Sequence, residues 1–201
     1  MQALLLIDIQ HDFLPGGSLA VPGGDGIIPV VNNILHCFEL VVATQDWHPA
    51  NHKSFASNHA GKQVFEEINL HGLSQVLWPN HCVQGSNGAA FSTAVNWNST
   101  EAIFRKGTNP EIDSYSGFYD NGHRKSTGLA DFLRGRGVTS VYVAGLAADY
   151  CVYFTAKDAI AEGFKTYVID DATRAISPEG YEKAKKDIEN KGGYIMHSST
   201  V

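Results

Sequence analysis

The sequence contains few cysteines and no long apolar run. Cys37, Cys82 and Cys151 form an odd, widely spaced set among 201 residues, which makes a poor disulfide framework and suits a reducing compartment. The apolar run at residues 3–7 ends at Asp8, and no basic segment precedes it. We therefore expect neither a signal peptide nor a membrane span, and a cytoplasmic location.

Positive charge is also scarce. Lysine and arginine number 15 against 21 acidic residues, which gives a net charge of −6. This balance counts against nucleic acid or an anionic membrane as a partner, so we expect a small-molecule substrate. The glycine clusters at residues 16–17 and 23–26 lack the spacing of nucleotide-binding loops. Formation of a homo-oligomer remains open.

The remaining composition is that of an ordinary globular protein, and the length fits a single domain spanning residues 1–201. Apolar segments predict six strands, at residues 2–9, 40–44, 102–106, 138–146, 165–169 and 194–197. Helical spacing predicts helices between them, at residues 27–38, 129–135, 149–163 and 178–190, with Ser126 or Thr127 capping the second. This alternation favours a three-layer α/β/α fold with a parallel sheet covered on both faces.

Residues 48–99 form a polar, turn-rich insertion that is too long for a plain connection. The insertion holds five of the nine histidines. Asp46 and His48 alternate on an extended segment, so both can reach one cation, with His81 as a third ligand. Mixed imidazole and carboxylate ligands suit zinc, iron or manganese. The alternative is a polar loop of mutually hydrogen-bonded histidines.

Three reactive residues lie at or just beyond the ends of separate strands: Asp8, Lys106 and Cys151. The carboxyl ends of parallel strands meet at one edge of a sheet, so these side chains can share a pocket. Cys151 is predicted in the first turn of a helix, where the backbone N–H groups favour a thiolate and lower the thiol pKa. Each residue also has an ordinary explanation, as a turn cap, a surface lysine and a core thiol.

Several segments together resemble the nicotinamidases of the isochorismatase-like cysteine hydrolases: residues 7–13, 45–55, 78–82, 105–107 and 145–152. The resemblance covers nearly the whole chain, in the order and spacing of that family. It implies an isochorismatase-like sheet with the Rossmann-like strand order 3-2-1-4-5-6. The metal motif distinguishes the chain from metal-free relatives, and the cysteine distinguishes it from isochorismatase itself.

The resemblance also implies a role for each site residue. Cys151 becomes the nucleophile, Lys106 its electrostatic partner and Asp8 the general base and acid. A cis peptide between Leu146 and Ala147 would direct the Ala147 and Cys151 N–H groups at the oxyanion. The remaining implied roles are metal ligation by Asp46, His48 and His81, and substrate binding by Phe13, Trp78 and Tyr115. His52 stays outside the ligand set.

The implied activity is hydrolysis of nicotinamide to nicotinate and ammonia through a cysteine thioester, in salvage of pyridine nucleotides. The implied cofactor is one divalent cation, zinc first, with iron or manganese as alternatives, and pyrazinamide is a further expected substrate. Two alternatives are a broader amidase and a non-catalytic binding or redox-sensing module with a reactive cysteine.

Overall fold

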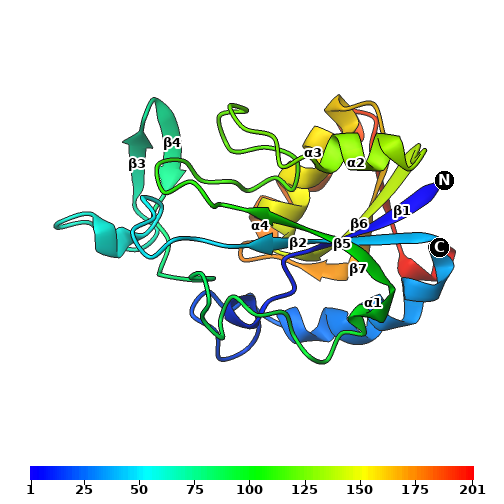
Figure 1. Cartoon of the computed structure of the whole chain (residues 1–201), viewed down its shortest axis with the longest axis horizontal. Coiled ribbons are helices and arrows are strands. Elements are labelled where there is room, and N and C mark those ends of the chain that lie inside the picture. Colours follow the sequence, from blue (N-terminus) through cyan, green and yellow to red (C-terminus); the bar gives the residue numbers. More distant parts are fainter.

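The computed structural model describes residues 1–201 and has a six-stranded parallel sheet at its centre (Figure 1). The strand order is β5-β2-β1-β6-β7-β8, which confirms the implied order 3-2-1-4-5-6. The six strands are β1 (Gln2–Ile7), β2 (Leu40–Asp46), β5 (Thr100–Lys106), β6 (Ser140–Leu146), β7 (Lys165–Arg174) and β8 (Tyr194–Met196).

Helices cover both faces of the sheet, as predicted. Leu4 and Leu6 point to one face, where they join the same apolar cluster as residues of α1 (Ile28–Ile34). Leu5 and Ile7 point to the other face, because successive side chains of a strand alternate. That face is covered by α2 (Leu129–Gly135), α3 (Tyr153–Ala161) and α4 (Pro178–Asn190). Figure 1 shows α1 below the sheet and both α2 and α3 above it.

Element boundaries differ from the sequence prediction at several places. Asp8 has φ 46, so β1 stops at Ile7 instead of continuing to residue 9. The predicted helix at residues 27–38 contains only two turns of α-helix, between 3-10 turns at Gly24–Ile27 and Leu35–Cys37. Gly128, in the left-handed region, is the N-cap of α2.

The insertion contains a two-stranded antiparallel hairpin that the sequence analysis missed, formed by β3 (Glu67–Leu70) and β4 (Leu73–Val76). Each strand has only four residues, mostly polar or half-exposed, so the apolar signal is weak. His71 and Gly72 make the turn with positive φ, which fits a tight hairpin turn. Figure 1 shows the hairpin at the far end of the molecule from the termini.

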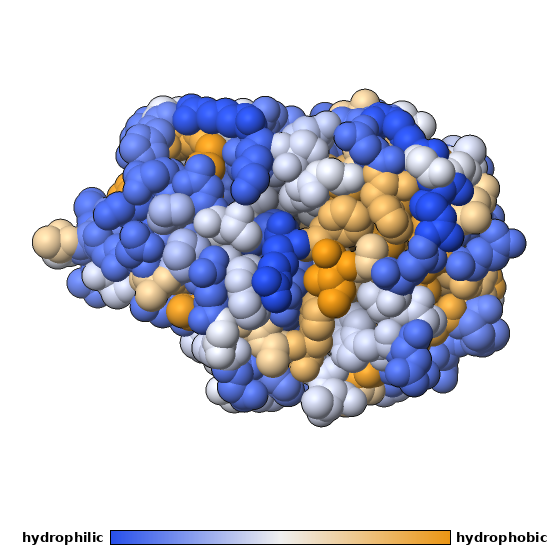
Figure 2. All heavy atoms as spheres, viewed as in Figure 1, coloured by the Kyte–Doolittle hydropathy of each residue, from blue (hydrophilic) through white to orange (hydrophobic).

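The surface of the insertion is mainly polar, as Figure 2 shows. Apolar atoms are visible over the edge strand β5, in which Ile103 is 53% exposed. No helix combines the length and hydropathy needed to cross a membrane.

Candidate active site and metal centre

The predicted catalytic residues meet at the carboxyl edge of the sheet. Asp8 directly follows β1, and Lys106 is the last residue of β5. Cys151 lies in a π-helical turn, Ala148–Val152, between β6 and α3. All three side chains are buried. The strand ends thus bring together residues that are up to 143 positions apart in sequence, from residue 8 to residue 151.

The Lys106 ammonium is the centre of this cluster. Its Nζ donates to Asp46 Oδ1 at 2.6 Å, to the Ser114 carbonyl at 3.0 Å and to Cys151 Sγ at 3.4 Å. Asp8 Oδ2 lies 2.8 Å from the same Nζ as an ion-pair contact. One lysine therefore links the thiol, the Asp8 carboxylate and the neighbouring Asp46.

Burial dominates the protonation of the thiol and of Asp8. It raises the pKa of Cys151 well above its ordinary value, although Lys106 lowers it. Burial also raises the pKa of Asp8, again against Lys106. The net direction is opposite to that expected from the helix N-terminus alone, because desolvation outweighs the favourable charge of Lys106.

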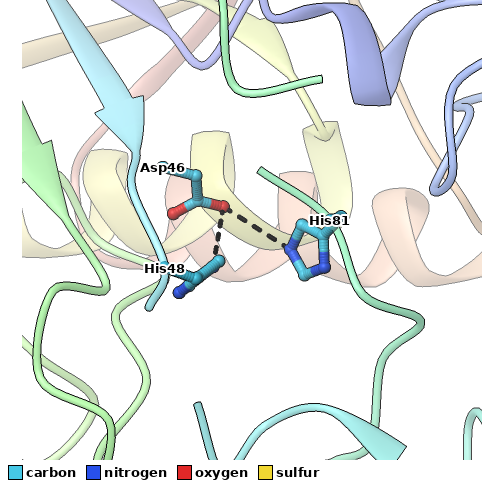
Figure 3. A group of neighbouring side chains, drawn as sticks. All are labelled: Asp46, His48 and His81. Atoms are coloured by element: carbon cyan, nitrogen blue, oxygen red, sulfur yellow. Dashed lines mark ion pairs between the residues drawn. The ribbon is translucent and has the colours of Figure 1, made fainter. Parts of the chain in front are cut away.

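The side chains of Asp46, His48 and His81 converge (Figure 3). Asp46 Oδ2 lies 3.5 Å from His48 Nε2 and 3.8 Å from His81 Nε2. Ligands about 2.0–2.1 Å from a tetrahedral zinc ion lie roughly 3.3–3.4 Å apart, so these separations come close to those of a cation site. Burial opposes ionisation of Asp46, but Lys106 and His48 hold its pKa well below the usual range.

Hydrogen bonds around the two histidines support the same arrangement. Nδ1 of His48 pairs with the Gly107 carbonyl at 3.0 Å, and Nδ1 of His81 pairs with the Pro79 carbonyl at 2.8 Å. A carbonyl only accepts, so each Nδ1 carries the hydrogen, and in the neutral ring Nε2 keeps its lone pair. Nitrogens in that state bind metals, and such carbonyl partners fix the ring orientation.

The backbone around Asp46 is fixed by Gln10, which is fully buried. The Gln10 side-chain amide donates to the Asp46 carbonyl at 2.8 Å and accepts the Asp46 N–H at 2.8 Å. Gly107, with φ +65, lies against the His48 ring, where a Cβ would clash. These contacts hold the backbone of Asp46 and the imidazole of His48 in place.

The other histidines of the insertion differ in whether they lie near this cluster. His52 is buried beside His48, with ring centroids 4.4 Å apart, and its Nε2 has no hydrogen-bond partner. His52 Nδ1 accepts the Ser54 N–H. His59 contacts the Lys53 carbonyl and His71 pairs with Glu111 at the surface, so neither reaches the centre.

A small cavity, with about 20 Å³ open to a water-sized sphere, borders Cys151. Two predicted substrate-binding residues, Trp78 and Tyr115, line it. Trp78 Nε1 donates to the Tyr115 hydroxyl at 3.2 Å. The third, Phe13, is buried and packs edge-on against His81 at 5.5 Å between ring centroids. The full lining is Leu19, Asp46, Trp78, His81, Asp113, Tyr115, Tyr150, Cys151 and Ile176.

Four lining residues were absent from the sequence prediction: Leu19, Asp113, Tyr150 and Ile176. Tyr150 precedes Cys151, and its ring packs edge-on against Trp78 at 4.8 Å between centroids. The sequence could have indicated Tyr150 as a lining residue, because it is adjacent to Cys151. Leu19 and Ile176 reach the cavity only through tertiary packing.

The peptide bond between Leu146 and Ala147 is cis, which confirms the implied geometry. Ala147 is the N-cap of the π-helical turn and is 3% exposed. The two residues implied for the oxyanion site, Ala147 and Cys151, therefore lie in the same connection between β6 and α3.

A buried thiol, lysine and carboxylate thus lie together beside a small cavity and a cluster of candidate metal ligands. The chain belongs to the isochorismatase-domain family, which matches residues 2–200. It is 51% identical to the nicotinamidase of Acinetobacter baylyi over 178 residues, covering 89% of this chain and 83% of that protein.

Solved structures agree with this placement. A nicotinamidase and pyrazinamidase of Acinetobacter baumanii matches with TM-score 0.96 and 48% identity, covering 99% of this chain and 97% of that one. The pyrazinamidase of Pyrococcus horikoshii in complex with zinc matches with TM-score 0.81 and 40% identity, covering 98% of each chain.

Proposed function

We propose that the protein is a nicotinamide amidohydrolase, which forms nicotinate and ammonia, and that it also hydrolyses pyrazinamide. One observation carries this proposal: the Lys106 ammonium contacts both Asp8 and Cys151, and Cys151 lines a small cavity with aromatic walls. Similarity to nicotinamidases over most of the chain supports the same reaction.

In this proposal Cys151 Sγ attacks the carboxamide carbon, and Asp8 accepts the thiol proton. Ligand atoms of Asp8 and Cys151 lie within 4.8 Å of each other, so only a small movement is needed for this transfer. Asp8 then returns the proton to the departing nitrogen, and ammonia leaves a thioester on Cys151. Water hydrolyses the thioester, which releases nicotinate and restores the thiol.

Lys106 stabilises the charges that this sequence produces. Its ammonium contacts the sulfur directly, so it lowers the cost of forming a buried thiolate. We assign stabilisation of the oxyanion to the backbone N–H groups of Ala147 and Cys151. We assign binding of the ring to Phe13, Trp78 and Tyr115, of which the last two line the cavity.

We propose that Asp46, His48 and His81 hold one divalent cation, zinc first, with iron or manganese as alternatives. The converging ligand atoms and the two Nδ1–carbonyl pairs fit such an ion. When bound, a divalent cation acts as a Lewis acid on the ring nitrogen of an aromatic amide and so orients its carboxamide.

The first experiment measures ammonia release from nicotinamide by the purified protein, with Cys151→Ala as the matched variant. Turnover by the unmodified protein and none by the variant would support the assignment. Equal rates in both would overturn the nucleophile. Elemental analysis of Asp46→Ala checks the cation, because retention of the metal by this variant would contradict the ligand assignment.

A broader amidase is the alternative enzyme, and comparing nicotinamide and pyrazinamide with open-chain ureido substrates separates the two. A redox-sensing module is the alternative outside catalysis. Mass spectrometry distinguishes it, because a sensor would show oxidation of Cys151 without turnover and an amidase would show an acyl adduct.

We further propose a role in salvage of pyridine nucleotides, by one domain that spans residues 1–201 with its insertion at residues 48–99. A cytoplasmic location fits the three free cysteines. Fractionation of cells and analytical ultracentrifugation would test the location and a homo-oligomer.

A further inference from the structure

The short segment between β7 and α4, residues 175–177, forms one wall of the cavity above Cys151. Its central residue, Ile176, lines the cavity and packs against the apolar cluster on the α1 face of the sheet. Ile176 is half-buried, and no side chain of the segment donates a hydrogen bond within the cavity. Its contribution to the wall is therefore steric.

One carboxylate fastens this segment. Asp149 Oδ1 accepts the backbone N–H of Ile176 at 2.9 Å, and Asp149 Oδ2 accepts that of Ser177 at 2.8 Å. Both oxygens thus bind consecutive N–H groups of the same segment. Hydrogen bonds to an ionised acceptor are about twice as strong as neutral ones, so the attachment is firm.

The position of Asp149 connects this wall to the nucleophile. Asp149 lies two residues before Cys151, within the same π-helical turn. A further hydrogen bond joins β7 to β6, in which the Thr173 hydroxyl donates to the Gly145 carbonyl at 2.7 Å. The distance between Ile176 and the thiol is thereby set by a short, hydrogen-bonded connection.

The size of the cavity gives this connection a consequence for substrate choice. The space in the cavity that a water-sized sphere can enter is about 20 Å³, far below the roughly 300–1,000 Å³ typical of ligand pockets. Any aromatic amide therefore contacts the walls of this cavity closely, and a fused second ring would meet the wall at Ile176.

We propose that Ile176 is a specificity-determining residue that excludes amides of fused bicyclic aromatic acids, and that Asp149 is the positioning residue that holds it in place. This inference rests on the proposed amidase function. It assigns to Asp149 a role in substrate selection, separate from the chemistry at Cys151.

The test compares kcat/KM for quinoline-3-carboxamide with that for nicotinamide. In Ile176→Ala, and in Asp149→Asn, whose amide NH₂ would face one of the two N–H donors, we expect the ratio to rise about tenfold or more, mainly through KM. Matched controls are Ile160→Ala, a half-buried isoleucine of α3, and Asp171→Asn, whose carboxylate accepts the Ser198 N–H elsewhere. Neither control residue lines the cavity, so both should leave the ratio unchanged.

The double variant Ile176→Ala/Asp149→Asn separates positioning from general destabilisation. If Asp149 acts through Ile176, adding Asp149→Asn to Ile176→Ala changes the ratio no further. If the double variant changes the ratio by the product of the two single effects, the positioning role of Asp149 is overturned. An unchanged ratio in Ile176→Ala, with nicotinamide turned over normally, would overturn the inference alone.

A second measurement does not depend on turnover. Alkylation of Cys151 by a small and a bulky maleimide is followed by peptide mass spectrometry, with the exposed Cys37 as internal reference. We expect alkylation of Cys151 by the bulky maleimide, relative to the small one, to rise in Ile176→Ala and Asp149→Asn. An equal rise in the controls would contradict the inference. Absence of nicotinamide hydrolysis by the unmodified protein would instead refute the proposed function and, with it, this inference.

Discussion

Replacement of Lys106 by methionine tests the electrostatic centre of the site. The lysine side chain is fully buried, with Asp46 Oδ1 at 2.6 Å and Asp8 Oδ2 at 2.8 Å from its Nζ. Methionine fills a similar volume but leaves two carboxylates facing each other without a cation. Removing one partner of a buried ion pair costs about 3–5 kcal/mol.

The expected loss of stability is therefore about 3–5 kcal/mol, and uptake of a proton by Asp8, whose pKa is already raised, keeps it from being larger. For a chain of this size each kcal/mol lowers Tm by roughly 2–4 °C, which predicts a fall of about 6–20 °C. The assay is thermal unfolding after dialysis against a chelator, because a bound cation would compensate Asp46.

Activity should fall as well, since Lys106 also contacts the Cys151 sulfur. We expect kcat for nicotinamide, measured after the cation is restored, to fall by about 10²–10⁴-fold. The control is Lys185→Met, which removes a surface lysine paired with Glu182 and should cost under about 1 kcal/mol. A Lys106→Met protein as stable and as active as the unmodified one would refute the reasoning.

Three further predictions concern the metal centre and the cavity. Gly107→Ala places a Cβ against the His48 ring at a positive φ, so we expect cation affinity, measured by competition with a chelator, to fall about 10–100-fold. Tyr115→Phe leaves the Trp78 Nε1–H without its hydroxyl acceptor, so KM for nicotinamide should rise with kcat changed little, and the free energy of unfolding should fall by about 1–3 kcal/mol. Chelation should abolish ammonia release, and zinc should restore it.

Each of these has a result that would contradict it. Unchanged cation affinity in Gly107→Ala would show that His48 needs no open space beside it. A Tyr115→Phe protein with a lowered kcat and an unchanged KM would place the hydroxyl in the chemistry and not in the cavity wall. Full activity in the presence of chelator, with the cation shown to be absent, would remove the metal from the proposed reaction.

The sheet was predictable from the sequence because its central strands, β1, β2 and β6, are buried on both faces. The run from Leu4 to Ile7 has no polar residue, and its periodicity needs no tertiary information. The hairpin β3-β4 lies on the surface and lacks that signal. Likewise, the first turn after β6 is π-helical, a local choice that apolar spacing does not encode.

The site was predictable where residues end strands or share a loop, as Asp8, Lys106 and Asp46 do. Residues that reach the cavity by packing, such as Ile176, gave no signal of their own. The raised pKa of Cys151 could not be predicted, because a sequence shows the helix N-terminus and does not show the burial that opposes ionisation. The helix cap at Gly128 was missed because glycine provides no side-chain oxygen.

The central claim is that Cys151 forms a thioester with the substrate. Mass spectrometry of protein quenched in acid during turnover of nicotinamide tests it most directly. We predict a nicotinoyl adduct on the peptide that contains Cys151, which disappears when the substrate is exhausted and is absent from Cys151→Ala. Steady release of ammonia with no adduct on Cys151, and turnover that persists in Cys151→Ala, would contradict it.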